Sequence, residues 1–215
     1  MFMFNIIRSN LIKVMIAAMW SGGKDSCLAV WKVIKTGKRI DKLICILSEG
    51  DKSRAHGLYK NTLIRQANAV GIDIIFGKKY DELKELVKLY NIKEIVFGDI
   101  FLESHRNWIE NFCRNIGVKP IFPLWGCKTL DLAKEFINEG FKAYIVAVRK
   151  DLLDLLGKEF NEEIINQLIR RGIDPCGENG EFHTFVVNGP LFKQPVKISF
   201  GKVWSNEKYY IIEIL

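Results

Sequence analysis

The sequence lacks paired cysteines. Five cysteines are spread over 215 residues, and none forms the C-x-x-C pair that zinc sites and thiol redox motifs use. Their odd number also argues against a framework of disulfides. We therefore expect a protein of a reducing compartment, the cytoplasm, without structural zinc.

Long apolar runs and runs of basic residues are absent as well. No segment approaches the roughly 20 apolar residues of a membrane-spanning helix. The first 14 residues lack the small-residue cleavage site of a secretory signal. The net charge is +7, but basic and acidic residues are interleaved, as in KKYDELKELVK. We expect neither a membrane nor a nucleic acid as a required partner, and a homo-oligomer is compatible with the sequence.

Apolar segments of strand length alternate with helical patterns over the first 120 residues. The expected strands are 13–20, 42–49, 73–77 and 94–99, and the expected helices are 25–36, 58–70, 80–91 and 104–116. Apolar strands that alternate with helices are typical of a parallel sheet covered on both faces. The sequence therefore predicts the α/β class with a doubly wound parallel sheet.

The pattern changes after residue 123, where the aromatic stretch FPLWG suits a linker. Beyond it, the expected helices are 129–139 and 161–171, and the expected strands are 141–148, 194–201 and 208–215, with a turn at 204–207. We divide the chain into a first domain, 1–125, and a smaller α+β domain, 126–215.

The turn after the first expected strand reads SGGKDS and consists of Ser21, Gly22, Gly23, Lys24, Asp25 and Ser26. A glycine-rich turn that leads into a helix exposes backbone N–H groups to an anion, and the helix start adds positive charge. The serines can donate hydrogen bonds, and Lys24 adds a cation. Asp25 fits beside phosphate if Mg²⁺ bridges the two, or else it caps the helix. The spacing matches neither common glycine-rich nucleotide motif.

A second concentration of polar residues lies in DPCGENGEFHTFV, residues 174–186. Asp174, Glu178, Glu181 and His183 fall within ten positions of one another, and two glycines keep the connection tight. In an extended segment, Glu181 and His183 share one face. The cluster could serve acid–base chemistry, Mg²⁺ or an amine nucleophile. The alternative is a turn with solvated acids and a structural histidine.

Other candidates follow expected strands, where nucleotides bind in open α/β sheets. Ser48 and Glu49 end the second strand, His56 follows in the next loop, and Gly98 and Asp99 end the fourth. Arg106 and Glu110 are one helical turn apart. These two either contact substrate or simply pair with each other on the helix.

The SGGKDS turn resembles the SGGxDS motif of the PP-loop ATP pyrophosphatases, which have an adenine nucleotide alpha-hydrolase-like fold. With residues 177–184, Arg106, Glu110 and the Pro123-Leu124-Trp125 segment, the chain resembles the diphthine–ammonia ligase family from residue 14 to the C-terminus. Trp108 and Asp99 depart from that family's usual residues, which are basic and small, respectively.

This resemblance implies ATP-dependent amidation of diphthine on elongation factor 2, through an acyl-adenylate that ammonia attacks, with release of AMP and pyrophosphate. ATP and Mg²⁺ would be the cofactors, with Asp25 on the metal. Because no glutaminase domain is evident, free ammonia is the expected nitrogen source. The expected ATP site comprises Ser21 to Ser26, Ser48 and Gly98. The expected catalytic residues are Asp25, Glu178, Glu181 and His183, and the expected substrate site comprises Arg106, Glu110, Asp174, Glu178, Glu181 and His183.

Two other functions fit parts of this pattern. A different PP-loop ATP pyrophosphatase, such as a tRNA-modifying enzyme, would be expected to carry paired cysteines or a basic RNA-binding appendage. A non-catalytic ATP-binding sensor would keep the nucleotide site but would not need the Glu/His cluster of residues 178–183.

Overall fold

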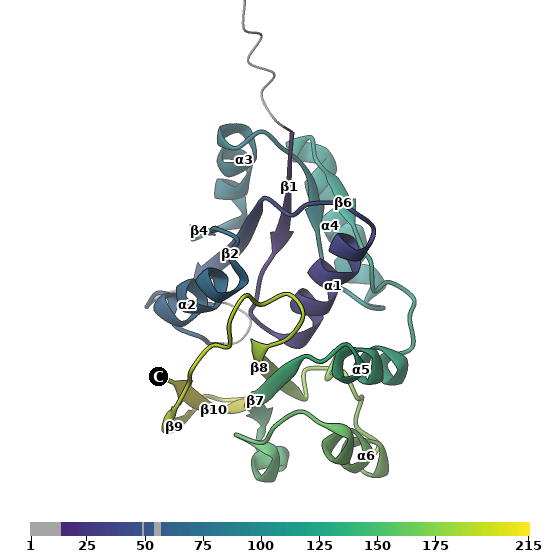
Figure 1. Ribbon diagram of the computed structural model, residues 1–215, viewed down its shortest axis with the longest axis vertical. Coiled ribbons are helices and arrows are strands. Elements are labelled where there is room, and N and C mark those ends of the chain that lie inside the picture. Colours follow the sequence, from purple (N-terminus) through teal and green to yellow (C-terminus); the bar gives the residue numbers. More distant parts are fainter. Residues whose placement is uncertain (1–13, 49, 54–56) are drawn as a thin grey trace, which may run out of the picture.

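A computed structural model describes residues 14–48, 50–53 and 57–215. Two of the weaker candidates, Glu49 and His56, lie outside the described residues, as does the first expected strand position at 13. The described residues form two sheets, a mostly parallel one near the N-terminus and an antiparallel one near the C-terminus (Figure 1). Among the described residues, no helix has the length and apolarity needed to cross a membrane.

The first sheet carries five parallel strands in the order β4-β2-β1-β5-β6. They are β1 (Met15–Met19), β2 (Lys42–Ser48), β4 (Ile74–Gly77), β5 (Ile92–Val96) and β6 (Lys119–Ile121). The short β3 (Lys52–Ser53) adds an antiparallel pairing to β2. The direction of winding reverses between β1 and β5, so the predicted doubly wound parallel sheet is confirmed.

Helices cover both faces of this sheet. They are α1 (Lys24–Lys35), α2 (Lys60–Val70), α3 (Tyr80–Leu89) and α4 (Glu103–Ile116). Buried side chains of α1 and α2 belong to one apolar core, and those of α3 and α4 belong to another. Two cores on opposite faces explain why the central strands are apolar along nearly their whole length.

The C-terminal part contains the second sheet, whose order is β8-β7-β10-β9 with antiparallel neighbours throughout. Its elements are α5 (Thr129–Asn138), β7 (Lys142–Arg149), a 3₁₀ segment (Lys150–Leu155), α6 (Glu162–Arg170), β8 (Phe182–Asn188), β9 (Phe200–Ser205) and β10 (Tyr209–Ile214). This sheet lies beside α1 and α2 (Figure 1) and shares their apolar core. The division at residues 125 and 126 stays a prediction, because that core runs across it.

One expected strand, 194–201, is wrong, because β9 begins only at Phe200. The segment before it crosses from β8 toward the end of α2, where the Lys193 backbone N–H donates to Ala69 O (2.8 Å). Pro195 has no N–H to donate to a neighbouring strand. The expected turn also starts later than 204, since Trp204 and Ser205 pair with β10. The side chain of Asn206 caps the turn by accepting from the N–H groups of Lys208 and Tyr209.

Gln66 of α2 joins three parts of the chain and is fully buried. Its Oε1 accepts from Trp20 Nε1 (2.8 Å), and its Nε2 donates to Gly22 O (2.9 Å) and Val186 O (2.7 Å). The SGGKDS turn, α2 and the second sheet are therefore connected through one side-chain amide.

We expect Gln66→Ala to lower the free energy of unfolding by about 2–4 kcal/mol, because it leaves buried polar groups without partners. Urea denaturation measures this change. Gln167→Ala on α6 is the matched control and should stay within about 0.5 kcal/mol of the wild type. Equal losses in the two variants would contradict the bridging role of Gln66.

Candidate functional site

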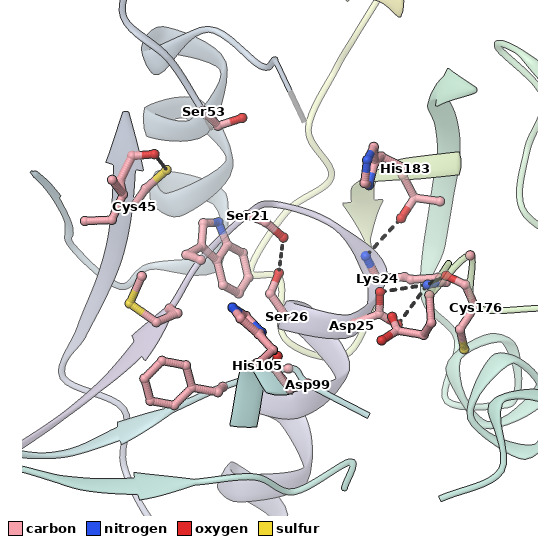
Figure 2. A pocket seen from close by; sticks show the side chains of 18 of the residues that line it. Ser21, Lys24, Asp25, Ser26, Cys45, Ser53, Asp99, His105, Cys176 and His183 are labelled. Carbon is pink, nitrogen blue, oxygen red and sulfur yellow. Dashed lines mark hydrogen bonds and ion pairs between the residues drawn. The ribbon is translucent and has the colours of Figure 1, made fainter. Parts of the chain in front are cut away.

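A cavity of about 380 Å³ opens at the carboxyl ends of β1, β2 and β5 (Figure 2). It therefore lies at the reversal between β1 and β5, where ligands bind in open α/β sheets. Its size is that of a small-molecule site. Residues of the SGGKDS turn line one side and Cys176, Glu178, His183 and Thr184 another, so the structure brings the two polar segments of the sequence together.

The SGGKDS turn leads directly into α1. Gly22 has φ +81°, and a Cβ there would lie 2.8 Å from Gln66 Oε1, so both backbone conformation and packing require glycine. Gly23 is the N-cap residue, and no side chain caps the helix. Capping therefore does not explain Asp25. The hydroxyl of Ser26 donates to Gly23 O (2.9 Å), and that of Ser21 donates to Ser26 Oγ (3.2 Å).

The ammonium of Lys24 is buried between the two parts of the chain. Its Nζ donates to Asp25 Oδ1 (2.8 Å) and Oδ2 (2.7 Å), and also to Cys176 O. Burial, the largest single contribution, would lower the pKa of Lys24, but the nearby Asp25, Cys176 and Glu178 together outweigh it and raise that pKa above its ordinary value. Lys24 thus stays charged. Its backbone N–H donates to Thr184 Oγ1 (3.0 Å), which adds a second link to β8.

Two carboxyl groups of the cavity have raised pKa values. Burial, assisted by the charge of Asp25, raises the pKa of Glu178 to about 8. Burial also raises the pKa of Asp25, although Lys24 opposes the shift. Crowding of acids in a partly dry site makes ionisation of all of them at once unfavourable. The site therefore offers a carboxyl group that can exchange a proton near neutral pH.

Asp174 and Glu181 shape the loop that carries Glu178, and neither lines the cavity. Asp174 Oδ1 accepts from the N–H groups of Cys176 (2.9 Å) and Glu178 (3.3 Å). The buried carboxylate of Glu181 accepts from the backbone (3.0 Å) and side-chain (3.1 Å) nitrogens of Asn179. Their contacts are those of structural residues of the loop.

The imidazole of His183 lines the cavity from β8 (Figure 2). Burial, with a smaller contribution from the charge of Lys24, lowers the pKa of His183 to about 4. The ring centroid lies 5.3 Å from that of Tyr209. At neutral pH His183 is therefore an uncharged imidazole.

Five other expected site residues do not line the cavity: Gly22, Gly23, Ser48, Arg106 and Glu110. The hydroxyl of the exposed Ser48 donates to Lys52 O (3.1 Å). Arg106 and Glu110 pair with each other on α4 (2.8 Å), and the guanidinium also lies over the rings of Phe122 and Trp125. Gly98 does line the cavity, and a Cβ there would lie 3.1 Å from the backbone of Asp25 and Ser26. Close packing against α1 therefore favours glycine at position 98.

Sequence reasoning missed His105, Trp108 and Tyr80 as cavity residues. His105, Trp108 and Phe112 form a stacked row along α4, and Tyr80 meets Trp108 edge to face at 4.8 Å. Aromatic residues at helical spacing, starting in the first turn after Asp99, are the signal that could have revealed this wall.

The lining fits an adenine nucleotide in its chemistry. Met19, Cys45, Ile46, Phe97 and Ile109 supply apolar surface, and the SGGKDS turn supplies hydroxyl groups and a helix N-terminus. Among the described residues, no group of three His, Cys, Asp or Glu side chains is arranged to hold a metal. A magnesium ion would therefore need phosphate oxygens and water beside a carboxylate such as Asp25, which is its usual mode of binding.

Comparison with known proteins identifies the family. The family models for the diphthamide synthase N-terminal and C-terminal domains match residues 14–120 and 128–214. The chain belongs to the diphthamide synthase family. The two matched ranges contain the SGGKDS turn and the 174–186 loop, respectively, so the resemblance seen in these motifs is confirmed.

Curated relatives of this diphthamide synthase family member carry the name diphthine–ammonia ligase. The Homo sapiens protein is 29% identical over 87% of this chain and 84% of its own length. The Mus musculus protein is 30% identical over 85% and 82%, respectively. A solved structure, described as a predicted subunit of a tRNA methyltransferase from Methanocaldococcus jannaschii, is 17% identical with a TM-score of 0.44. The matched region spans 85% of this chain and the full length of that structure's chain.

The lowered pKa of His183 makes stability depend on pH. Between pH 6.5 and about 4, His183 binds a proton in the unfolded chain but not in the folded chain. The free energy of unfolding therefore falls as the pH falls through this range. We expect His183→Gln to reduce this loss, as measured by urea denaturation at pH 7, 6, 5 and 4. Parallel curves for wild type and variant would contradict the burial of a neutral imidazole.

Proposed function

We propose that this diphthamide synthase family member amidates diphthine on elongation factor 2 with ATP and ammonia. The observation that carries the proposal is that SGGKDS and the 174–186 loop, far apart in sequence, line one cavity at the reversal of the sheet. The names of the curated relatives support the same reaction. We propose that the protein acts in the cytoplasm and that it requires neither a membrane nor a nucleic acid as a partner. A homo-oligomer is compatible with this proposal.

The first part of the chain would hold ATP. The N-terminus of α1 and the hydroxyls of Ser21 and Ser26 would bind phosphate oxygens, and the apolar lining would contact the adenine. Asp25 would hold Mg²⁺, which supplies charge neutralisation of the phosphates when bound. Residues 126–215 would contribute the substrate side through Glu178 and His183.

The chemistry would proceed in two displacements. A carboxylate oxygen of diphthine attacks the α-phosphorus of ATP, and the bond to pyrophosphate breaks. Ammonia then attacks the carbonyl carbon of the acyl-adenylate, and AMP leaves with the electrons of the broken C–O bond. The attacking nitrogen loses a proton during this second step. Glu178, with a pKa of about 8, is the group suited to accept it, whereas the neutral His183, with a pKa of about 4, would orient the substrate.

The proposal is tested by incubating the protein with diphthine-bearing elongation factor 2, ATP and ammonium. We expect conversion of the modified histidine to its amide, detected by mass spectrometry, with one AMP and one pyrophosphate per amide. Glutamine in place of ammonium should not support turnover. ATP binding without turnover would favour the sensor, and turnover only with tRNA would favour an RNA-modifying enzyme; either outcome would reject the proposal.

Glu178→Gln should lower the rate of amide formation by about 10²–10⁴-fold, the usual contribution of general acid–base catalysis. The affinity for ATP, measured by calorimetry, should change little, because the loss falls on kcat. The exposed Glu207→Gln in the β9–β10 turn is the matched control and should behave as wild type. A near-normal rate in Glu178→Gln would remove Glu178 from the mechanism.

A further inference from the structure

A triphosphate in the cavity needs a cation, and the described lining residues offer three candidates: Lys24, His183 and His105. An ammonium has three N–H donors. Those of Lys24 face three acceptors, the two carboxylate oxygens of Asp25 and the carbonyl oxygen of Cys176. Lys24 is only 3% exposed. To bind phosphate, it would have to break contacts that hold the two parts of the chain together.

His183 does not supply a charge at neutral pH, because burial lowers its pKa to about 4. Its neutral ring can make one donor and one acceptor contact but cannot neutralise a phosphate. Among the cavity residues in the described part of the chain, this leaves His105.

His105 is held in place on two sides. Its Nδ1 is hydrogen-bonded to Asp99 Oδ1, and its ring stacks on that of Trp108 with an angle of 4° between the planes. Half of the side chain stays exposed (49%), in contrast to Lys24. His105 lines the same cavity as Ser21 and Ser26 of the SGGKDS turn (Figure 2).

The backbone explains why this pair lies beside the phosphate turn. Gly98 packs against Asp25 and Ser26 closely enough that a Cβ would lie 3.1 Å from their backbone atoms. Asp99 is the next residue, and the first turn of α4 follows with His105. The contact therefore fixes the carboxylate that orients the imidazole next to the N-terminus of α1.

We propose that His105 is a phosphate-binding residue of the ATP site and that Asp99 is its positioning residue. With Nδ1 held by Asp99, the Nε2–H of the imidazolium is the donor for a phosphate oxygen. The inference rests on the proposed ATP site and adds to it a cation that neither motif contains.

The charged groups around His105 favour its protonated form. The hydrogen bond of Asp99 raises the pKa of His105, burial opposes the shift, and the charges of Asp99 and of Glu178, across the cavity, add to the rise. The Lys24–Asp25 pair is the remaining charged part of the lining. ATP affinity should therefore fall as the pH rises through the pKa of His105.

Calorimetric titration of the full chain with ATP, AMP and adenosine tests the role of His105. We expect His105→Gln to weaken ATP by about 10- to 100-fold, the effect of a lost charge-assisted hydrogen bond, and to leave adenosine unchanged. His105→Arg should keep most of the ATP affinity. The exposed Asn107→Ala, on the same helix, is the control and should match wild type. An equal loss for adenosine would mean that the ring contacts the base and would overturn the inference.

The role of Asp99 is tested by the pH dependence of ATP binding between pH 5 and 9. Asp99→Asn should move the midpoint of the decline to lower pH, because the charge that raises the pKa of His105 is removed; a merely structural role would weaken binding equally at every pH. His105→Gln should make that decline shallower, and what remains belongs to Glu178, whose pKa is about 8. Wild type that fails to bind ATP would reject the proposed function, whereas wild type that binds ATP as tightly as His105→Gln at every pH would reject only this inference.

Discussion

The buried ammonium of Lys24 is the contact on which the rest of the site depends. A charge taken out of water is strongly unfavourable unless it is paired and hydrogen-bonded. Lys24 meets that requirement with Asp25 from its own helix and Cys176 O from the second part of the chain. The 174–178 loop must therefore lie over the start of α1. This position buries Glu178 at the cavity near Asp25, and that burial, with the charge of Asp25, raises the pKa of Glu178.

The same contact determines which residues of the SGGKDS turn can bind an anion. Because Lys24 faces the C-terminal loop, the groups left for an anion are the helix N-terminus and the hydroxyls of Ser21 and Ser26, which would have to turn away from Ser26 Oγ and Gly23 O to donate to it. Acidic side chains outnumber cationic ones around them, since Asp25, Asp99 and Glu178 all line the cavity, and the raised pKa values of Asp25 and Glu178 reflect this crowding and their burial. Such a site binds a triphosphate well only when further positive charge, from a metal or from His105, enters the balance.

Much of the fold could be predicted because local and global signals agree in the first part of the chain. Apolar strands between amphipathic helices specify a parallel sheet, and α1 to α4 start and end within two residues of the expected bounds. The second part was harder. Residues 196–199 alternate apolar and polar side chains as a strand does, but β9 begins only at Phe200, and tertiary contacts such as that of Lys193 N with Ala69 O determine the path of the segment.

The site was predictable where glycine and polar residues cluster, and less so elsewhere. Both polar segments were found from sequence, but the role of each residue depends on where its side chain points. The carboxylate of Glu181 points to Asn179, whereas Glu178 lines the cavity. His105 was missed because a single histidine in a helix carries no signal until the fold places Asp99 beside it.

The way the two parts are joined determines which wall of the cavity can admit a large substrate. Lys24, Gln66 and Thr184 tie β8 to the SGGKDS turn with buried hydrogen bonds, and one apolar core continues beneath them. Opening that side would expose a charge and several unpaired polar groups at once. Among the described residues, no buried hydrogen bond ties the first turns of α4 to β8, and Phe101 and Leu102 just before α4 and Trp108 within it are each about 40% exposed. A protein-bound side chain would meet less resistance along that wall, where His105 already faces the cavity.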